Sequence, residues 1–154
     1  METREEIFRV ADERDVDVIA EHRRHMFEEA GMDFSDGDAP FRSWLAERLS
    51  TGAYRGWIVS HGARPVGGVG MMILDWPPHP RHVQDDRRGY ILNLYVEPAY
   101  RRRGIAAELM ERCYAHARGL HIAYLTLHAS TMGRPLYERD GWSGTNEMSI
   151  SLAR

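Results

Sequence analysis

The sequence predicts one α/β domain built on a mixed central sheet, with helices on both faces of the sheet. Helical and strand-like periodicities alternate along the chain, two segments are apolar on both faces, and no repeat, linker or low-complexity stretch divides the 154 residues. Strands that are apolar on both faces are typical of a sheet covered on both sides. The expected element order is β-α-α-β-β-β-α-β-α-β, in a single domain spanning residues 1–154.

The chain begins with a short strand and two amphipathic helices. Residues 7–10 form the strand, and Asp12 is the expected N-cap of a helix that ends at Gly31. The apolar residues of this helix fall on one stripe, with Arg23 as the polar exception. A second helix repeats the helical spacing and ends at Thr51-Gly52.

The period then changes to that of strands. Residues 54–60 and 66–74 are expected to form strands joined by a hairpin turn. Residues 75–88, with three prolines, are expected to form a loop whose length in a compact domain indicates a functional role. A further strand covers residues 90–96 and is apolar on both faces apart from Asn93.

The remainder of the chain continues the alternation. A helix is expected over about residues 103–118, followed by a strand over 122–127 that is apolar on both faces. A short helix over about residues 132–139 must hold Pro135 in its first turn. Residues 142–152 are expected to return as a last strand or hairpin.

Composition argues against several classes of protein. The net charge of −3 is too small for a nucleic-acid or membrane-surface binder, although all 20 basic residues are arginine. Cys113 is the only cysteine, which excludes an intrachain disulfide and favours a reducing compartment. No apolar run has the length of a membrane span, and the acidic N-terminus differs from a signal peptide. We therefore expect a cytoplasmic protein.

The segment from Val96 to Ala106 carries the strongest functional signal. A buried strand ends at Pro98, three arginines follow, and a helix begins at Gly104 without a Ser, Thr, Asp or Asn cap. Three cations at the positive end of a helix dipole destabilise it unless an anion is bound. Free N–H groups of residues 103–106 would face a phosphate there, and the glycine would allow close approach. A solvated basic turn is the alternative that these residues leave open.

Two motifs then connect the chain to a known family. Arg101-x-x-Gly104-x-Ala106, preceded by Tyr95-Val96-x-Pro98, resembles the acetyl-CoA signature of the GNAT superfamily of N-acetyltransferases. Residues 136–142, Leu-Tyr-Glu-Arg-Asp-Gly-Trp, are similar to the closing motif of that family. Gly67-Gly68 also matches the family's habit of a glycine in the third strand. The resemblance covers most of the chain, from the first strand to the last.

The resemblance implies acetyl-CoA as the acyl donor and assigns residues to it. Main-chain N–H groups and neighbouring side chains of the signature loop would hold the phosphates: Arg101, Arg102, Arg103, Gly104, Ile105 and Ala106. The pantetheine arm would pair with the backbone of Leu94, Tyr95 and Val96. Tyr137 would hydrogen-bond the CoA sulfur and protonate the departing thiolate. A phenol with an ordinary pKa near ~10 is protonated at neutral pH and can donate.

The motifs do not identify the general base. Many family members carry an asparagine before the last helix that contacts the pantetheine arm, whereas residues 128–131 here are His-Ala-Ser-Thr, of which Ser130 is the candidate contact. The strand over residues 90–96 carries no carboxylate before Glu97. Candidates by position are Tyr90, Asn93, His128 and Asp75, and a structural role is the alternative for each.

These observations predict transfer of an acetyl group from acetyl-CoA to a primary amine of a small molecule or peptide. The amine would attack directly in a ternary complex, because no activated nucleophile is visible. The alternative is a domain of the same fold that binds acyl-CoA without turnover, as a sensor or interaction module. The arginines and histidines of residues 75–88 favour an acceptor with a carboxylate, and an antibiotic or polyamine stays open.

Metal binding and self-association are weaker possibilities. His79 with His82, and His22 with His25, lack the fixed third and fourth ligands of a metal site, so no metal is expected. Family members often form dimers, and the expected last strand would be a natural edge for pairing in a homodimer.

Overall fold

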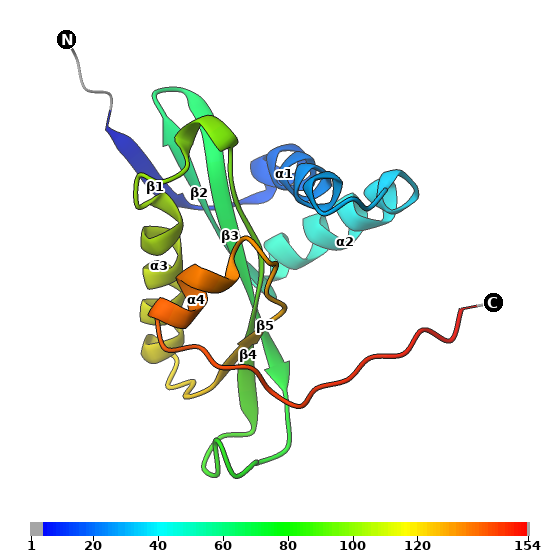
Figure 1. Ribbon diagram of the computed structural model, residues 1–154, viewed down its shortest axis with the longest axis vertical. Coiled ribbons are helices and arrows are strands. Elements are labelled where there is room, and N and C mark those ends of the chain that lie inside the picture. Colours follow the sequence, from blue (N-terminus) through cyan, green and yellow to red (C-terminus); the bar gives the residue numbers. More distant parts are fainter. Residues whose placement is uncertain (1–4, 154) are drawn as a thin grey trace.

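The computed structural model describes residues 5–153 and shows a five-stranded sheet flanked by helices (Figure 1). The strands are β1 (Glu6–Val10), β2 (Tyr54–His61), β3 (Arg64–Asp75), β4 (Arg87–Val96) and β5 (Leu125–Leu127). The helices are α1 (Val16–Glu29), α2 (Asp38–Thr51), α3 (Ile105–Gly119) and α4 (Arg134–Arg139). The strands follow chain order across the sheet, antiparallel from β1 to β4 and parallel between β4 and β5.

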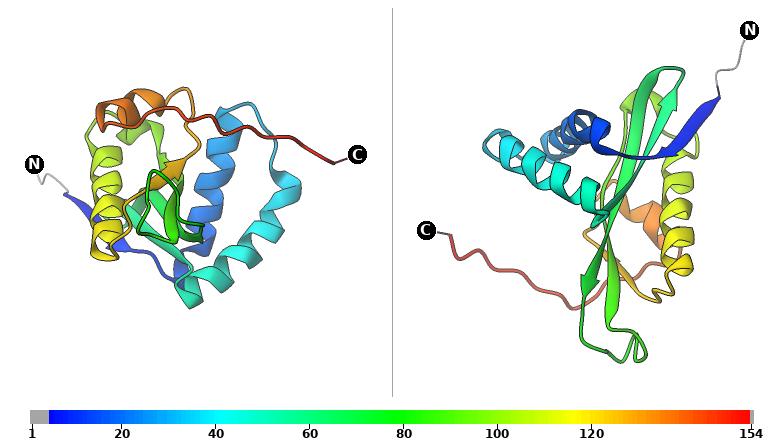
Figure 2. Two further views of the ribbon diagram at one scale, coloured as in Figure 1. Left: turned by 90° about the horizontal axis from the view of Figure 1, so that it is seen from below. Right: turned by 180° about the vertical axis from the view of Figure 1, so that it is seen from behind.

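The helices cover both faces of the sheet, as the sequence predicted (Figure 2). On one face α1 and α2 enclose a core that includes Leu45 and Ile58. On the other face α3 packs on β3 and β4 around Val66, Met71 and Leu109, which are buried completely or almost completely. The mixed α/β fold class is therefore confirmed.

The predicted helix caps are present, except that a 3-10 turn separates the cap at Asp12 from α1. Asp12 and Asp15 form a reciprocal capping box around a single 3-10 turn (Glu13–Asp15), and α1 begins directly after it. Arg9 of β1 donates to the Asp15 carboxylate at 2.6 Å and ties the strand to this turn. At the end of α2, Gly52 adopts the left-handed conformation, with φ of 80°, that a glycine C-cap allows.

β4 and β5 pair over a short stretch only. Their register joins Gly89 to Leu125 and Ile91 to Leu127, and it ends there. The strand expected over residues 122–127 is thus reduced to its last three residues. Beyond Ile91, β4 continues to Val96 with β3 on one side and no strand on the other in the described part of the chain. The sheet consequently opens between β4 and β5, and the expected pantetheine-contacting residues 94–96 lie on this free edge.

The β3–β4 hairpin extends further than predicted. Asp75 pairs with Arg87 and Leu74 with Arg88, so the connecting loop comprises residues 76–86. The Arg88 guanidinium lies 4.0 Å from the Trp76 ring centroid and 2.9 Å from His82 Nε2. These contacts join the two ends of the loop, and the proline-rich sequence itself stays in the loop, as predicted.

The expected last strand is not formed. Residues 143–153 run in an extended path away from the body of the protein and pair with no strand of the described chain (Figure 1). The apolar alternation at Met148, Ile150 and Leu152 is real, but all three side chains are exposed. A strand needs a partner for its backbone groups, and this segment has none within residues 5–153. Within residues 5–153, no helix has both the length and the apolar character that crossing a bilayer would require.

Glycine at position 70 is required by the packing of Tyr54. A Cβ atom there would overlap the Tyr54 hydroxyl, which accepts a hydrogen bond of 3.1 Å from Asn93 Nδ2. Gly70→Ala should therefore displace Tyr54 and lower the free energy of unfolding by about 2 kcal/mol. Urea unfolding followed by circular dichroism measures this loss.

Gly144→Ala is the matched control, since its Cβ would meet nothing within 4 Å. Its effect should stay within about 0.5 kcal/mol. Equal stability of the two variants would contradict the role given to Gly70.

Candidate active site

The loop between β4 and α3 is shaped by two left-handed residues. After Val96 the chain makes one 3-10 turn (Pro98–Tyr100), and Arg102 and Gly104 then adopt φ angles of 63° and 81°. α3 begins at Ile105 with Gly104 as its N-cap and no side chain on the cap. The predicted uncapped helix start is therefore present.

The backbone at this helix start has a run of unused donors. Arg101 N donates to Pro98 O at 3.3 Å and Glu108 N donates to Gly104 O at 3.1 Å. Among residues 5–153, no acceptor receives a hydrogen bond from the backbone N–H groups of residues 102–107. Unsatisfied N–H groups at the positive end of a helix dipole make an anion-binding site. The free donors thus start at Arg102, one residue after the position where the family motif begins.

The three arginines of the loop have different surroundings. Arg101 donates to both carboxylate oxygens of Glu29 at 2.7 and 2.8 Å, and its Nε donates to Val96 O at 2.8 Å. It therefore joins the end of α1 to the end of β4. Arg103 packs over Tyr100 at 5.1 Å. Arg102 is exposed and forms no ion pair with the described residues, which leaves its charge available for a ligand.

A bulge in β4 is centred on Asn93. Gly68 pairs with Tyr95 and Gly70 with Leu92, so two residues of β4 face one of β3, and Asn93 has φ of 59°. Its side chain is buried, donates to Tyr54 and accepts a hydrogen bond from Arg23 of α1. The amide oxygen and the amide nitrogen of Asn93 each have a partner, and these two hydrogen bonds hold the bulge in place. A polar side chain that is fully engaged in this way positions the strand.

Arg23 is held in an aromatic cage. Its guanidinium carbon lies 4.8 Å from Phe27, 5.3 Å from Phe34 and 4.6 Å from Phe41, measured to the ring centroids. Burial lowers the pKa of Arg23, and the cage compensates in part through cation–π attraction. This polar exception on the helical stripe therefore connects α1 to the bulge.

Tyr137 of α4 is buried and lines a cavity beside β5. Its ring packs against Trp142 with centroids 6.1 Å apart, and Trp142 Nε1 donates to Tyr114 Oη at 2.8 Å. Burial raises the pKa of Tyr137 to about 12, so the phenol keeps its proton at neutral pH. A phenol that keeps its proton can donate a hydrogen bond.

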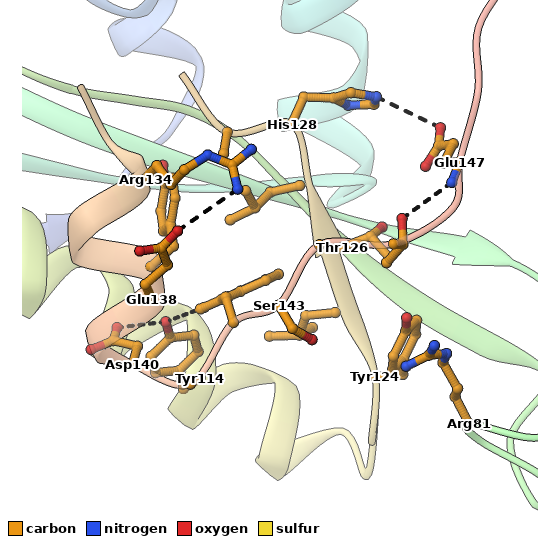
Figure 3. Close-up of a pocket in the computed structure, with 18 of the residues that line it drawn as sticks. Arg81, Tyr114, Tyr124, Thr126, His128, Arg134, Glu138, Asp140, Ser143 and Glu147 are labelled. Carbon is orange, nitrogen blue, oxygen red and sulfur yellow. Dashed lines mark hydrogen bonds and ion pairs between the residues drawn. The ribbon is translucent and has the colours of Figure 1, made fainter. Parts of the chain in front are cut away.

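Two of the four candidate bases meet in the structure. Tyr90 Oη and His128 Nδ1 form a hydrogen bond between β4 and the residue that follows β5, and His128 Nε2 lies 3.6 Å from Glu147 Oε1 (Figure 3). Burial raises the pKa of Tyr90, with a smaller contribution from the Glu147 charge. Asp75 lies apart, at the exposed far end of the β3–β4 hairpin.

Ser130 shapes the turn before α4. Its hydroxyl accepts from Gly133 N at 3.0 Å, and its carbonyl accepts from Arg134 N at 3.0 Å. The helix it precedes carries Tyr137, with Pro135 in the first turn as expected. Within residues 5–153, no three His, Cys, Asp or Glu side chains gather as metal ligands would.

A cavity of about 690 Å³ lies along the outer edge of β5 (Figure 3). One wall is β5 with His128, another is α4 with Tyr137, and the third is the segment over residues 143–149. Tyr137 and His128, the hydrogen-bond partner of Tyr90, therefore border the same cavity.

Comparison with known proteins agrees with this geometry. Residues 16–142 match the model of the Acetyltransferase (GNAT) family. The chain belongs to this family. A GCN5-related N-acetyltransferase from Ralstonia eutropha shares 46% identity, with 96% of this chain and 99% of that chain covered and a TM-score of 0.94.

Further GNAT-like structures extend the comparison. A predicted acetyltransferase from Clostridium acetobutylicum, solved with acetyl-CoA, shares 27% identity over 96% of this chain and 97% of its own, with a TM-score of 0.89. The aminoglycoside N-acetyltransferase AAC(6')-Iy, in complex with CoA, shares the fold at a TM-score of 0.77, with 12% identity over 97% and 95% of the two chains. No curated protein matches the chain.

Sequence reasoning missed two parts of this GNAT site. The first is the Arg23–Asn93–Tyr54 network, whose signal was the single polar residue on the apolar stripe of α1. The second is the contact of Tyr90 with His128. Placing the two buried strands side by side in parallel would have found it, because Tyr90 pairs with Thr126 and His128 follows two residues later.

The raised pKa of Tyr137 predicts a loss of stability in alkali. The folded-state pKa of about 12 lies above the ordinary value of 10.0, so the unfolded chain loses its proton first as the pH rises. The stability that the protonated Tyr137 phenol gives the folded state is fully present below pH 10 and is lost between pH 10 and about 12. In that window Tyr137→Phe should make the free energy of unfolding less dependent on pH, by about 1 kcal/mol per pH unit.

Urea unfolding of both proteins at several pH values tests this. Below pH 9 their difference in stability should be constant, which serves as the internal control. Identical slopes above pH 10 would show that Tyr137 ionises normally in the folded protein.

Proposed function

We propose that the chain is an acetyl-CoA-dependent N-acetyltransferase that acts on a primary amine by direct attack in a ternary complex. The observation that carries the proposal is the run of free backbone N–H groups over residues 102–107, beside the open edge of β4. A phosphate-bearing ligand with an extended arm fits this combination of an anion site and an unpaired strand. The relatives solved with acetyl-CoA and CoA support the choice of ligand.

Acetyl-CoA would be bound partly by the loop before α3 and partly by β4. The N–H groups from Arg102 to Ala106 and the free charge of Arg102 would hold the phosphates, while the Arg101 side chain stabilises the loop through Glu29. The backbone of residues 94–96 would pair with the pantetheine arm, because β5 has already diverged there. Ser130 orders the turn that precedes α4 and contributes mainly by positioning Tyr137.

The chemistry then depends on proton transfers at two places. Acetyl-CoA supplies a thioester whose carbonyl carbon accepts the amine and whose thiolate departs. Tyr137 keeps its phenolic proton at neutral pH and would donate it to the leaving sulfur. The imidazole of His128, hydrogen-bonded to Tyr90, would take the proton of the attacking ammonium directly or through water. Glu147 at 3.6 Å would stabilise the resulting imidazolium.

Asn93 has a positioning role in this scheme. Its amide oxygen accepts from Arg23 and its amide nitrogen donates to Tyr54, and a neutral amide group takes no part in proton transfer at neutral pH. The bulge that it maintains separates β4 from β5 and thereby keeps the reacting groups on one opening. The alternative of a CoA-binding module without turnover keeps the donor site and leaves Tyr137 and His128 without a task.

The location of the acetyl-CoA site is tested by Gly104→Glu. A carboxylate at the helix start would repel the phosphates, so acetyl-CoA affinity measured by isothermal titration should fall at least about 100-fold. The matched control is Gly52→Glu, which places the same residue at φ of 80°, again with nothing within 4 Å, at the end of α2. Unchanged affinity in Gly104→Glu, or an equal loss in Gly52→Glu, would contradict the assigned location.

Turnover is tested by Tyr137→Phe. Removing the acid should lower kcat by about 100-fold or more and leave acetyl-CoA affinity nearly unchanged, because the hydroxyl acts on the leaving group. Thiol release is followed spectrophotometrically against a set of amines, including amino acids, peptides, aminoglycosides and polyamines. Tight CoA binding by the wild type without turnover of any amine would favour the CoA-binding module without catalysis. Full activity of Tyr137→Phe would show that Tyr137 is not the general acid.

A further inference from the structure

Arg23 of α1 carries a positive charge that pairs with no carboxylate within residues 5–153. It is half-buried, and its contacts are the hydrogen bond to Asn93 and the three phenyl rings of its cage. The next residue of the helix, Arg24, pairs with Glu28 at 3.2 Å. A cation that is withdrawn from water without a counter-ion is costly, and the rings compensate for only part of that cost. The position therefore favours an anion that comes from outside the chain.

The unused donors of Arg23 lie on one edge of its guanidinium. Nη1 donates to the side-chain oxygen of Asn93, whereas Nε is buried and has no acceptor. Nη2 likewise donates to no acceptor in the part of the chain that the structure describes. The Nε–H and one Nη2–H of an arginine point in the same direction, and together they bind the two oxygens of a carboxylate. The bond to Asn93 thus holds the guanidinium and leaves its bidentate edge free.

This free edge lies close to the groups proposed for proton transfer. Asn93 and Tyr90 both belong to β4, and Tyr90 is hydrogen-bonded to His128. Burial is the main cause of the raised pKa of Tyr90, and the charge of Arg23 opposes it, so the two side chains are electrostatic neighbours. An acceptor that is held at Arg23 would therefore have its amine within reach of the proposed base.

Two features favour a carboxylate over other anions. The free edge presents two parallel donors, which match the two oxygens of a carboxylate. The phenyl rings and the burial of Nε leave little water at the site, and a dianion such as a phosphate monoester would lose more hydration there than a monoanion.

The sequence placed the preference for a carboxylate on the loop over residues 75–88. The structure gives the arginines at the end of this segment other contacts, since Arg87 lies 3.6 Å from Asp85 and Arg88 stacks on Trp76. Arg23 has no acidic partner in the described chain, so its charge is the one that remains available beside Asn93.

We infer that Arg23 is the residue that recognises the acceptor, and that the acceptor is an amine that also carries a carboxylate, such as an amino acid or the C-terminal end of a short peptide. The carboxylate binds the Nε–Nη2 edge, and the amine is directed toward Tyr90 and His128. The fate of the amine rests on the proposed acetyl transfer, whereas the carboxylate site rests on the surroundings of Arg23.

Paired acceptors test this recognition. Each amino acid or dipeptide is compared with its own carboxamide, which keeps the amine and removes the negative charge. Arg23→Gln replaces the cation by a neutral amide, so it should lower kcat/KM for the acids about 100-fold and leave the carboxamides nearly unchanged. The change in the acid-to-carboxamide ratio between wild type and variant is independent of the different amine pKa values of the two compounds. A larger change for dipeptides than for amino acids would identify a peptide end as the source of the carboxylate.

Two further variants separate charge from geometry and from structure. Arg23→Lys keeps the charge without the bidentate edge and should retain only part of the preference for acids. Arg24→Gln is the matched control on the same helix, and its acid-to-carboxamide ratio should equal that of the wild type. A loss in Arg23→Gln that is equal for acids and carboxamides would show a purely structural role. It would overturn the inference and leave the acetyltransferase function intact.

Binding without turnover distinguishes this site from the proposed function. In ¹⁵N-labelled wild-type protein, the Nε–H signal of Arg23 should shift when an N-acetylated amino acid is added and stay in place with the corresponding carboxamide. Either Arg23 variant assigns the signal by its absence, so the measurement itself needs no variant to be active. A shift without turnover of any amine would support the carboxylate site and contradict the proposed transferase. Equal responses to the acid and the carboxamide would overturn the inference.

Discussion

The short pairing of β4 with β5 is the constraint on which the rest of the site depends. Three residue pairs join the strands, and the register stops at Ile91 and Leu127. Past this point β4 bulges at Asn93, and its free edge leads to the helix start at Gly104. The anion site and the open strand edge lie along this divergence, and the cavity with Tyr137 lies beside β5. A longer β5 would close the sheet and remove the opening.

The divergence is maintained from the opposite face of the sheet. Gly70 leaves room for the Tyr54 ring, Tyr54 accepts from Asn93, and Asn93 accepts from Arg23 of α1. A bulge leaves backbone groups out of the hydrogen-bond pattern of the sheet, so it persists only where several neighbouring contacts hold it in place. Here α1 supplies that support twice, through Arg23 at the bulge and through the ion pair of Glu29 with Arg101 at the end of β4.

Local signals in the sequence predicted most of the elements but not their mutual contacts. The cap at Asp12, the helix end at Gly52 and the uncapped start at Gly104 follow from short-range chemistry and were all predicted. Arg23 was visible as an exception on its stripe, yet its partner lies 70 residues away. Arg88 stacks on Trp76 and joins the two ends of the β3–β4 loop, a contact that no local pattern encodes.

The prediction of a last strand over residues 142–152 was wrong, and the reason is physical. The alternation over residues 142–152 predicted a strand, but this segment is extended without a strand partner in the described chain, because a pattern states only which residues would face a partner and not which segment supplies it. In the structure residues 143–149 line the cavity beside β5, and they add no strand to the described sheet. An alternating pattern therefore predicts the extended conformation of a segment, whereas its pairing depends on contacts that lie outside the segment.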